Sequence, residues 1–206
     1  MNTVSQEGLL DWAGPILQGA LTTLEIAVLA YAIGLVLGLI GASARLSPWA
    51  PLRGLATAYS TAVRAVPELL LIILLYYAGS QALTALIHAM GLPGQVAING
   101  FVTAVGVLAF VQGAYMTEVL RGAILAIPKG QKEAGQALGM SNLRIFWRIT
   151  LPQLWRVALP GLGNLYLIML KDTALVSLIT LEEIMRKAQT AANATKEPFT
   201  FYLLAA

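Results

Sequence analysis

The sequence predicts an all-α membrane protein, and both its composition and the length of its apolar stretches support that prediction. Hydrophobic residues make up 58% of the 206 residues and charged residues 11%, whereas a soluble domain contains roughly 25% charged residues. The mean hydropathy is +0.74. Several stretches reach the roughly 20 apolar residues that a helix needs to cross a bilayer. We therefore expect one transmembrane domain over residues 1–206, with most of its length in contact with lipid.

Apolar stretches predict four complete spans and the beginning of a fifth. Residues 1–14 carry no Lys or Arg, so they lack the basic start of a secretory signal peptide. We expect them to form a short amphipathic or loop segment before the first span. The last residues, "FTFYLLAA" (199–206), resemble the opening of a fifth span that this sequence does not complete. The four complete spans are expected at residues 18–44, 55–82, 97–120 and 157–181.

The distribution of basic residues predicts the orientation of these spans. The linker between the first two spans contains Arg45 and Arg53 and no acid, whereas residues 83–98 contain no Lys or Arg. The linker between the third and fourth spans contains a single acid, Glu133, and the basic residues Lys129, Lys132, Arg144, Arg148 and Arg156. By the positive-inside rule, both basic linkers face the cytoplasm and the N-terminus lies outside.

The second basic linker contains a segment too hydrophilic for lipid, "EAGQALGMSNLRIFWRITLP" (133–152). Local signals predict two short helices here, the first over 129–138 and the second continuing to about Thr150. Gly139 is a typical residue after a helix end, and Ser141 is a typical N-cap. The pair Leu151-Pro152 is expected to break the second helix and to start the next one.

A helical hairpin outside the membrane must rest on another surface, and two partners are considered. Arg144 and Arg148 share one face of the second helix, while Ile145, Phe146 and Ile149 share another. Such a helix can lie on anionic lipid. Alternatively, the hairpin is a docking element for a cytoplasmic partner, which we favour because the spacing of its residues matches a known signature.

The hairpin resembles the cytoplasmic signature of the membrane subunits of ABC importers. That signature consists of Glu-Ala-Ala, three residues, Gly, nine residues and Ile-x-Leu-Pro. Gly135 departs from it, since this position is usually Ala; the residue remains small, although it has a lower helix propensity. The matching residues are Glu133, Ala134, Gly139, Ile149, Leu151 and Pro152.

The resemblance extends over nearly the whole chain. Residues 64–79, 113–134, 158–164 and 170–184 resemble the polar amino-acid uptake branch of type I ABC importers. Within it, the chain is most similar to the Q-type subunit of histidine, lysine-arginine-ornithine and opine permeases. The resemblance implies a multi-pass permease of the bacterial inner membrane, with a core of five transmembrane helices per subunit. It also implies an ATPase-coupling surface that comprises Glu133, Ala134, Gly135, Gly139, Arg148, Leu151 and Pro152.

The sequence has no GxxxxGK[ST] phosphate loop, so we expect that the chain is not itself the ATPase. The resemblance implies that the ATPase and the other components of the importer are separate partner proteins. We expect a non-catalytic subunit that binds no cofactor, with ATP and Mg in two separate ATP-binding subunits. A second, homologous permease subunit is favoured over an identical one. A periplasmic solute-binding protein would deliver the substrate, membrane lipid would surround the helices, and no nucleic acid is expected.

The implied substrates are polar, basic amino acids (histidine, arginine, lysine, ornithine) or opines. Glutamine- or glutamate-type amino acids are the alternative substrates. A secondary transporter or channel subunit without an ATPase is the alternative function. It would explain charges inside the membrane, but it would not explain a hairpin with the signature spacing.

Ionisable residues inside predicted spans are candidates for the substrate pathway. Arg64 and Glu68 are spaced i, i+4, so they either neutralise each other or leave Glu68 to line a cavity beside Pro67. Glu118 is expected to be an inner-gate or register residue, whereas Glu25 is a weaker candidate. The predicted pathway residues are Glu68, Arg64, Glu118, Tyr115, Lys171 and Asp172.

Two further features are predicted to be structural or without a role. Gly34 and Gly38 form a GxxxG pair, which we expect to serve packing within the subunit. His88 is the only histidine, and we expect it to be a solvated residue of the outer linker.

Overall fold

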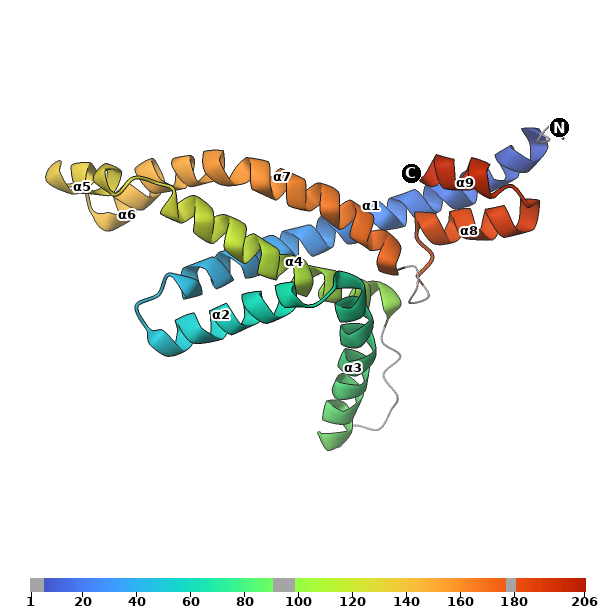
Figure 1. The fold of residues 1–206 in the computed structure, drawn as a ribbon, viewed down its shortest axis with the longest axis horizontal. Helices are drawn as coiled ribbons and strands as arrows, with labels where there is room; N and C mark the ends of the chain where they lie inside the picture. The colour runs from blue at the N-terminus through green and yellow to red at the C-terminus, as the bar shows by residue number, and fades with distance from the viewer. Residues whose placement is uncertain (1–5, 91–98, 177–180) are drawn as a thin grey trace. The chain divides into compact units, whose positions relative to one another are not determined.

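The computed structural model describes residues 6–90, 99–176 and 181–206, and every regular element among them is helical (Figure 1). The all-α prediction is therefore confirmed. The elements are α1 (Gln6–Arg45), α2 (Ala50–Ala65), α3 (Glu68–Ala89), α4 (Gly100–Leu125), α5 (Lys129–Ala137), α6 (Asn142–Ile145), the π-helical turn η1 (Phe146–Thr150), α7 (Leu151–Val176), α8 (Ile184–Thr195) and α9 (Pro198–Ala205).

The predicted count of spans is only partly recovered. Among the described residues, α1 and α4 are long and apolar enough to cross a membrane, and the bent pair of α2 and α3 makes a third span if it is counted as one. Helix α7 covers 157–176 of the fourth predicted span, and 177–180 lie outside the described residues. Helix α9, with eight residues, covers the start of the predicted fifth. The five-helix core stays an expectation.

Three boundaries differ from the sequence prediction. Helix α1 begins at Gln6 and runs on into the first span, so residues 6–14 are part of that helix rather than a separate segment. The second span is not continuous: α2 ends at Ala65, and Val66 is extended at φ −103° and ψ 138°. The residue before a proline avoids helical angles, which explains the break before Pro67. Helix α3 extends to Ala89, so His88 lies in its last turn rather than in a linker.

The chain divides into two compact units, which we describe separately. The first comprises residues 1–30, 69–108 and 169–206. Its described core lies where α8 and α9 meet α1, and its buried residues Ala188, Ala191, Ala192 and Phe201 pack against Trp12 and Ile16. The second unit comprises residues 31–68 and 109–168. Its buried core is formed by Ala42, Met116, Leu120, Ala123, Leu154, Ala158, Leu162 and Leu165.

In the first unit, a buried carboxylate joins α8 to α1. Glu183 is fully buried and caps α8, accepting a 2.8 Å hydrogen bond from the Arg186 backbone N–H. Thr23 of α1 donates its hydroxyl to the same carboxylate at 3.4 Å and accepts the Ile184 N–H at 3.2 Å. Burial raises the pKa of Glu183 above its usual range. The segment 182–198, which lies between the fourth and fifth predicted spans, is therefore largely a capped and docked helix.

In the second unit, glycines bring α1 and α4 into close contact. A Cβ on Gly34 would lie 3.3 Å from the Ala109 carbonyl oxygen, and one on Gly38 would overlap Met116. This agrees with the preferred prediction that the GxxxG pair serves packing within the subunit. The contacts advance in the same direction along both helices, which therefore run parallel. Both basic linkers consequently leave this unit at the same end, as the predicted orientation requires.

Candidate functional site

The predicted hairpin forms within the second unit from α5, α6 and η1. Gly139 adopts φ +72°, and Gly139 and Met140 donate their N–H groups to the carbonyls of Gln136 (2.9 Å) and Gly135 (3.0 Å). These two bonds are the Schellman arrangement that ends a helix at a left-handed glycine. Ser141 accepts the Arg144 N–H at 3.4 Å as the N-cap of α6. Both the stop and the cap are thus confirmed.

Helix α7 begins at Leu151 as predicted, but the predicted break between it and the preceding helix is wrong. Helix α6 continues through the π turn η1 directly into α7, and the Leu151 N–H bonds to the Phe146 carbonyl, five residues back. Pro152 has no N–H, and its ring would crowd the carbonyl four residues earlier in a regular helix. A π turn widens the helix at this point. The hairpin is therefore joined to α7 without an interruption.

Gly135 lies at the contact between the two halves of the hairpin. It is buried, and a Cβ built on it would lie 2.9 Å from Ile145 Cγ1 and 3.1 Å from Ile149 Cδ1. Its small size thus serves packing inside the hairpin. Sequence reasoning assigned the small residue to docking with a partner and missed this internal contact.

The outer surface of the hairpin combines charges with large apolar side chains. Glu133, Ala134 and Arg148 are exposed, and among the described residues neither charge forms an ion pair. Exposed apolar groups beside charges typically mark an interaction surface. The exposed apolar side chains are Leu138, Leu143, Phe146 and Trp147. Of the remaining signature residues, Leu151 is half-buried and Pro152 is exposed.

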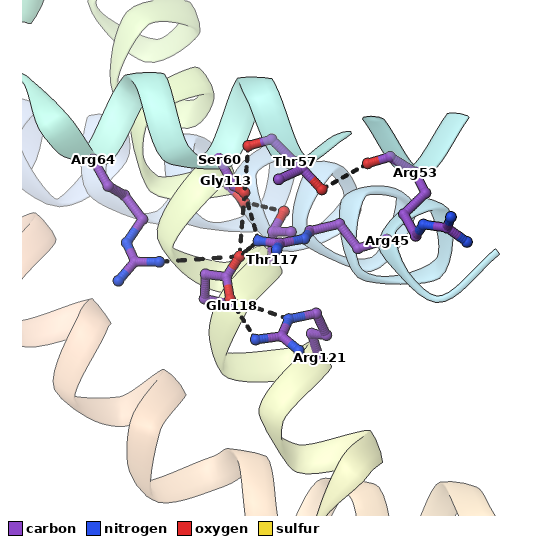
Figure 2. A network of polar contacts seen from close by, with 9 residues as sticks. All are labelled: Arg45, Arg53, Thr57, Ser60, Arg64, Gly113, Thr117, Glu118 and Arg121. Atoms are coloured by element: carbon purple, nitrogen blue, oxygen red, sulfur yellow. Dashed lines mark hydrogen bonds and ion pairs between the residues drawn. The ribbon is translucent and has the colours of Figure 1, made fainter. Parts of the chain in front are cut away.

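A second candidate site is the charge cluster around Glu118, which Figure 2 shows in close-up. We call Arg45, Ser60, Arg64, Glu118 and Arg121 the Glu118 cluster. Glu118 Oε1 pairs with Arg45 and accepts the Ser60 hydroxyl at 3.2 Å. Glu118 Oε2 accepts Arg121 Nε and Nη2 at 3.1 and 3.0 Å. One carboxylate thereby ties α1 and α2 to α4.

Arg64 pairs with this cluster rather than with Glu68. Its Nη1 lies 4.0 Å from Glu118 Oε1, and its guanidinium lies 5.8 Å from the centre of the Tyr115 ring. Helix α2 ends at Ala65, so Arg64 and Glu68 are not one turn apart on a common helix. The structure contains no Arg64–Glu68 ion pair among its described residues. Glu68 is half-buried in the first turn of α3.

The remaining predicted pathway residues do not join the Glu118 cluster. Asp172 of α7 is buried, and the neighbouring Lys171 is exposed, so the two side chains have different surroundings. Glu25 of α1 is exposed. Arg45 and Ser60, which sequence reasoning left out of the pathway, are in contact with Glu118. The sequence analysis placed Arg45 in a basic linker, and no sequence motif pointed to Ser60 as a site residue.

The fold and the hairpin are consistent with a family comparison that covers nearly the whole chain. The model of the binding-protein-dependent transport system inner membrane components matches residues 14–206. The chain belongs to this family. It is thus a relative of inner-membrane transport permeases, and the hairpin signature found in the sequence lies inside the matched region.

Several curated members of the permease family are similar to this chain over most of their length. The chain is 44% identical to the octopine transport system permease protein OccQ of Rhizobium radiobacter, covering 95% of this chain and 82% of that protein. It is also 44% identical to the histidine/lysine/arginine/ornithine permease HisQ of Escherichia coli, with coverage of 95% and 86%. The arginine ABC transporter permease ArtQ of the same organism is 40% identical, with coverage of 93% and 86%.

A solved structure of the same kind has a closely similar fold. The crystal structure of an amino acid ABC transporter with histidines superimposes with a TM-score of 0.80 at 29% sequence identity. The match covers 99% of this chain and 90% of that one. The permease fold expected from the sequence resemblance is therefore confirmed.

Proposed function

We propose that this chain is the membrane subunit of an ATP-driven importer that carries basic amino acids or opines into the cytoplasm. The observation that supports this most strongly is the hairpin of α5, α6 and η1, which combines the signature spacing with an exposed surface. The permease family match and the named substrates of HisQ, ArtQ and OccQ support the same function. Glutamine- or glutamate-type substrates are the second choice, since none of these three names includes them.

Coupling would use the continuous helical connection between the hairpin and α7. ATP-driven closure of a partner would move the hairpin as a rigid body. Gly135 packs between Ile145 and Ile149, which holds the two halves of the hairpin together. Because η1 runs into α7 without a loop, a displacement of the hairpin would be transmitted to the core of the second unit.

The proposed subunit composition rests on the absence of a phosphate loop from the sequence and on the exposed docking surface of the hairpin. The sequence contains no GxxxxGK[ST] phosphate loop. ATP and Mg would therefore be bound in two separate ATP-binding subunits, each facing one permease hairpin. A homologous permease subunit would complete the pathway, and a periplasmic solute-binding protein would supply the substrate to a complex whose N-termini lie outside.

The proposed substrate pathway includes charged side chains of two kinds, those that pair with each other and those that remain accessible to a substrate. Glu118 is held by three arginines and serves as a register or inner-gate residue, with Arg64 and Tyr115 beside it. Glu68, at the break between α2 and α3, is a candidate for a substrate ammonium or basic side chain. Lys171 and Asp172 of α7 are further candidates for this pathway.

The test is purification of the tagged chain in mild detergent after expression with its neighbouring transport genes. We expect an ATP-binding subunit to copurify, and we expect the complex to take up radiolabelled arginine or octopine only with ATP. Uptake that needs an ion gradient but no ATPase would instead support a secondary transporter. Recovery of the intact chain without any ATP-binding subunit would count against the proposal.

A further inference from the structure

The Glu118 cluster contains more positive than negative charge. Three guanidinium groups, from Arg45, Arg64 and Arg121, approach the single carboxylate of Glu118. In the described part of the chain, the only other side chain bonded to that carboxylate is the neutral Ser60 hydroxyl. Guanidinium groups remain protonated in proteins, so the cluster has a formal charge of +2 among the described residues. Charge of this kind attracts an anion, particularly where water is partly excluded.

The three arginines are not equivalent, because only two of them donate hydrogen bonds to Glu118. Arg121 binds one carboxylate oxygen through two nitrogens, and Arg45 binds the other. Arg64 reaches Glu118 only at 4.0 Å, which is too long for a hydrogen bond. Among the described residues, no hydrogen bond of the Arg64 side chain is found. Its five N–H donors are therefore available to a ligand.

Arg64 is also positioned to bind an oxyanion. Its side chain is 43% exposed, against 19% for Arg45 and 31% for Arg121. The ring of Tyr115 lies 5.8 Å from its guanidinium and helps to orient it. Arg64 occupies the last turn of α2, two residues before the extended residue Val66. Interrupted helices of this kind typically border substrate sites in membrane transporters.

We propose that Arg64 binds the carboxylate of the transported substrate through its free guanidinium edge, while Arg45 and Arg121 hold Glu118 in place. This inference rests on the proposed function and adds a residue role to it. A carboxylate is common to all α-amino acids and to opines, so this contact would recognise the whole class. Discrimination among side chains would then be made elsewhere. The planar fork of an arginine fits a carboxylate through two parallel hydrogen bonds.

A phospholipid phosphate offers the same oxyanion chemistry, and the experiment must separate the two sources. The purified permease–ATPase complex, in nanodiscs and without solute-binding protein, is titrated with arginine and with argininamide, which lacks the carboxylate. Both titrations are made for the wild type, Arg64→Gln and Arg64→Lys. Arg53→Gln is the matched control, because Arg53 is an exposed arginine of the same helix outside the Glu118 cluster. Each titration is repeated in nanodiscs with and without anionic lipid.

We expect Arg64→Gln to weaken arginine binding about tenfold or more while leaving argininamide binding unchanged. Arg64→Lys should retain part of the affinity, and Arg53→Gln all of it. Equal losses for arginine and argininamide, with the complex intact, would overturn the assignment. A loss that disappears when anionic lipid is omitted would assign Arg64 to lipid phosphate and also overturn it. A wild-type complex that binds neither arginine nor octopine would refute the proposed substrate class as well, and absence of the complex would refute the proposed function.

Discussion

Gly135 of α5 lies so close to Ile145 of α6 that a Cβ at position 135 would be 2.9 Å from Ile145 Cγ1. The clash would be with the side chains of Ile145 and Ile149, which can shift by small amounts. Gly135→Ala should therefore be tolerated, because a gain of about 1 kcal/mol in helix propensity offsets the tighter packing. Gly135→Leu should separate the two halves of the hairpin and abolish ATP-dependent uptake at normal membrane levels. Equal uptake by both variants would disprove the internal packing role.

Gly139 should be sensitive because of its backbone rather than its surroundings. It has φ +72°, and a Cβ on it would meet nothing within 4 Å. Gly139→Val should cost roughly 1–2 kcal/mol of hairpin stability, because a β-branched residue resists the left-handed region. Gly139→Asn should retain more activity, since asparagine tolerates this conformation. Uptake and protease resistance of the hairpin measure both effects, and identical behaviour of the two variants would exclude a conformational cause.

Removing the carboxylate of Glu118 should destabilise the second unit. Glu118→Gln would leave three neighbouring guanidinium groups without their anion, at a cost of roughly 3 kcal/mol. The measurement is the thermal unfolding temperature of the detergent-solubilised complex. Recovery in the double variant Arg45→Gln/Glu118→Gln is expected, because it removes one of the stranded cations. An unchanged unfolding temperature in the single variant would show that the ion pairs do not fix the helices.

The docking of α8 should weaken as the pH rises. Burial raises the folded-state pKa of Glu183 above its ordinary value of 4.5. Its stabilising contribution is therefore fully present below 4.5 and is lost as the pH rises through the raised folded pKa. Hydrogen exchange of α8 between pH 4 and 8 should show increasing opening, which Glu183→Gln should remove.

The neighbouring Glu182 supplies the control for this pH effect. It is exposed, and its hydrogen bond and charge attraction to Lys187 lower its pKa. Its contribution has the opposite sign, because it is present above 4.5 and lost on acidification. Glu182→Gln should therefore leave the opening of α8 at rising pH unchanged. Opening that is the same in Glu183→Gln as in the wild type would contradict the role of the buried carboxylate.

The orientation can be tested with reporter fusions. A fusion after Lys132 should report the cytoplasm, because basic loops face inward. A fusion after Leu92 should report the outside, because residues 83–98 contain no Lys or Arg. The reverse pattern would overturn the orientation, and the same location for both fusions would overturn the span assignment.

Local chemistry explains which features the sequence could predict. Gly139 and Ser141 act on backbone groups within four residues of themselves, so the stop and the cap were visible in the sequence. Pro67 is visible in the sequence as a cause of a helix break. Hydropathy alone nevertheless predicted one continuous span across it, because the stretches on both sides are mostly apolar. The π turn before Pro152 was missed, because proline is accommodated there by widening the helix rather than by breaking it.

The charge partners required tertiary information. Arg45 and Ser60 reach Glu118 from 73 and 58 residues away along the chain. An i, i+4 rule applied to Arg64 presupposes a continuous helix, and the end of α2 at Ala65 removes that condition. Gly135 was assigned to an external contact because its partner, Ile145, is brought near only when the hairpin closes.

The most direct test of the account is whether the exposed apolar surface of the hairpin binds an ATP-binding subunit. The measurement is the amount of ATP-binding subunit that copurifies with the wild type, with Leu138→Ser/Leu143→Ser and with the control Gln131→Ser, an exposed polar position on α5. We predict that the double variant loses most of the copurifying subunit at normal membrane levels, while the control retains it. Undiminished copurification with the double variant would contradict the assignment of the hairpin as the docking element.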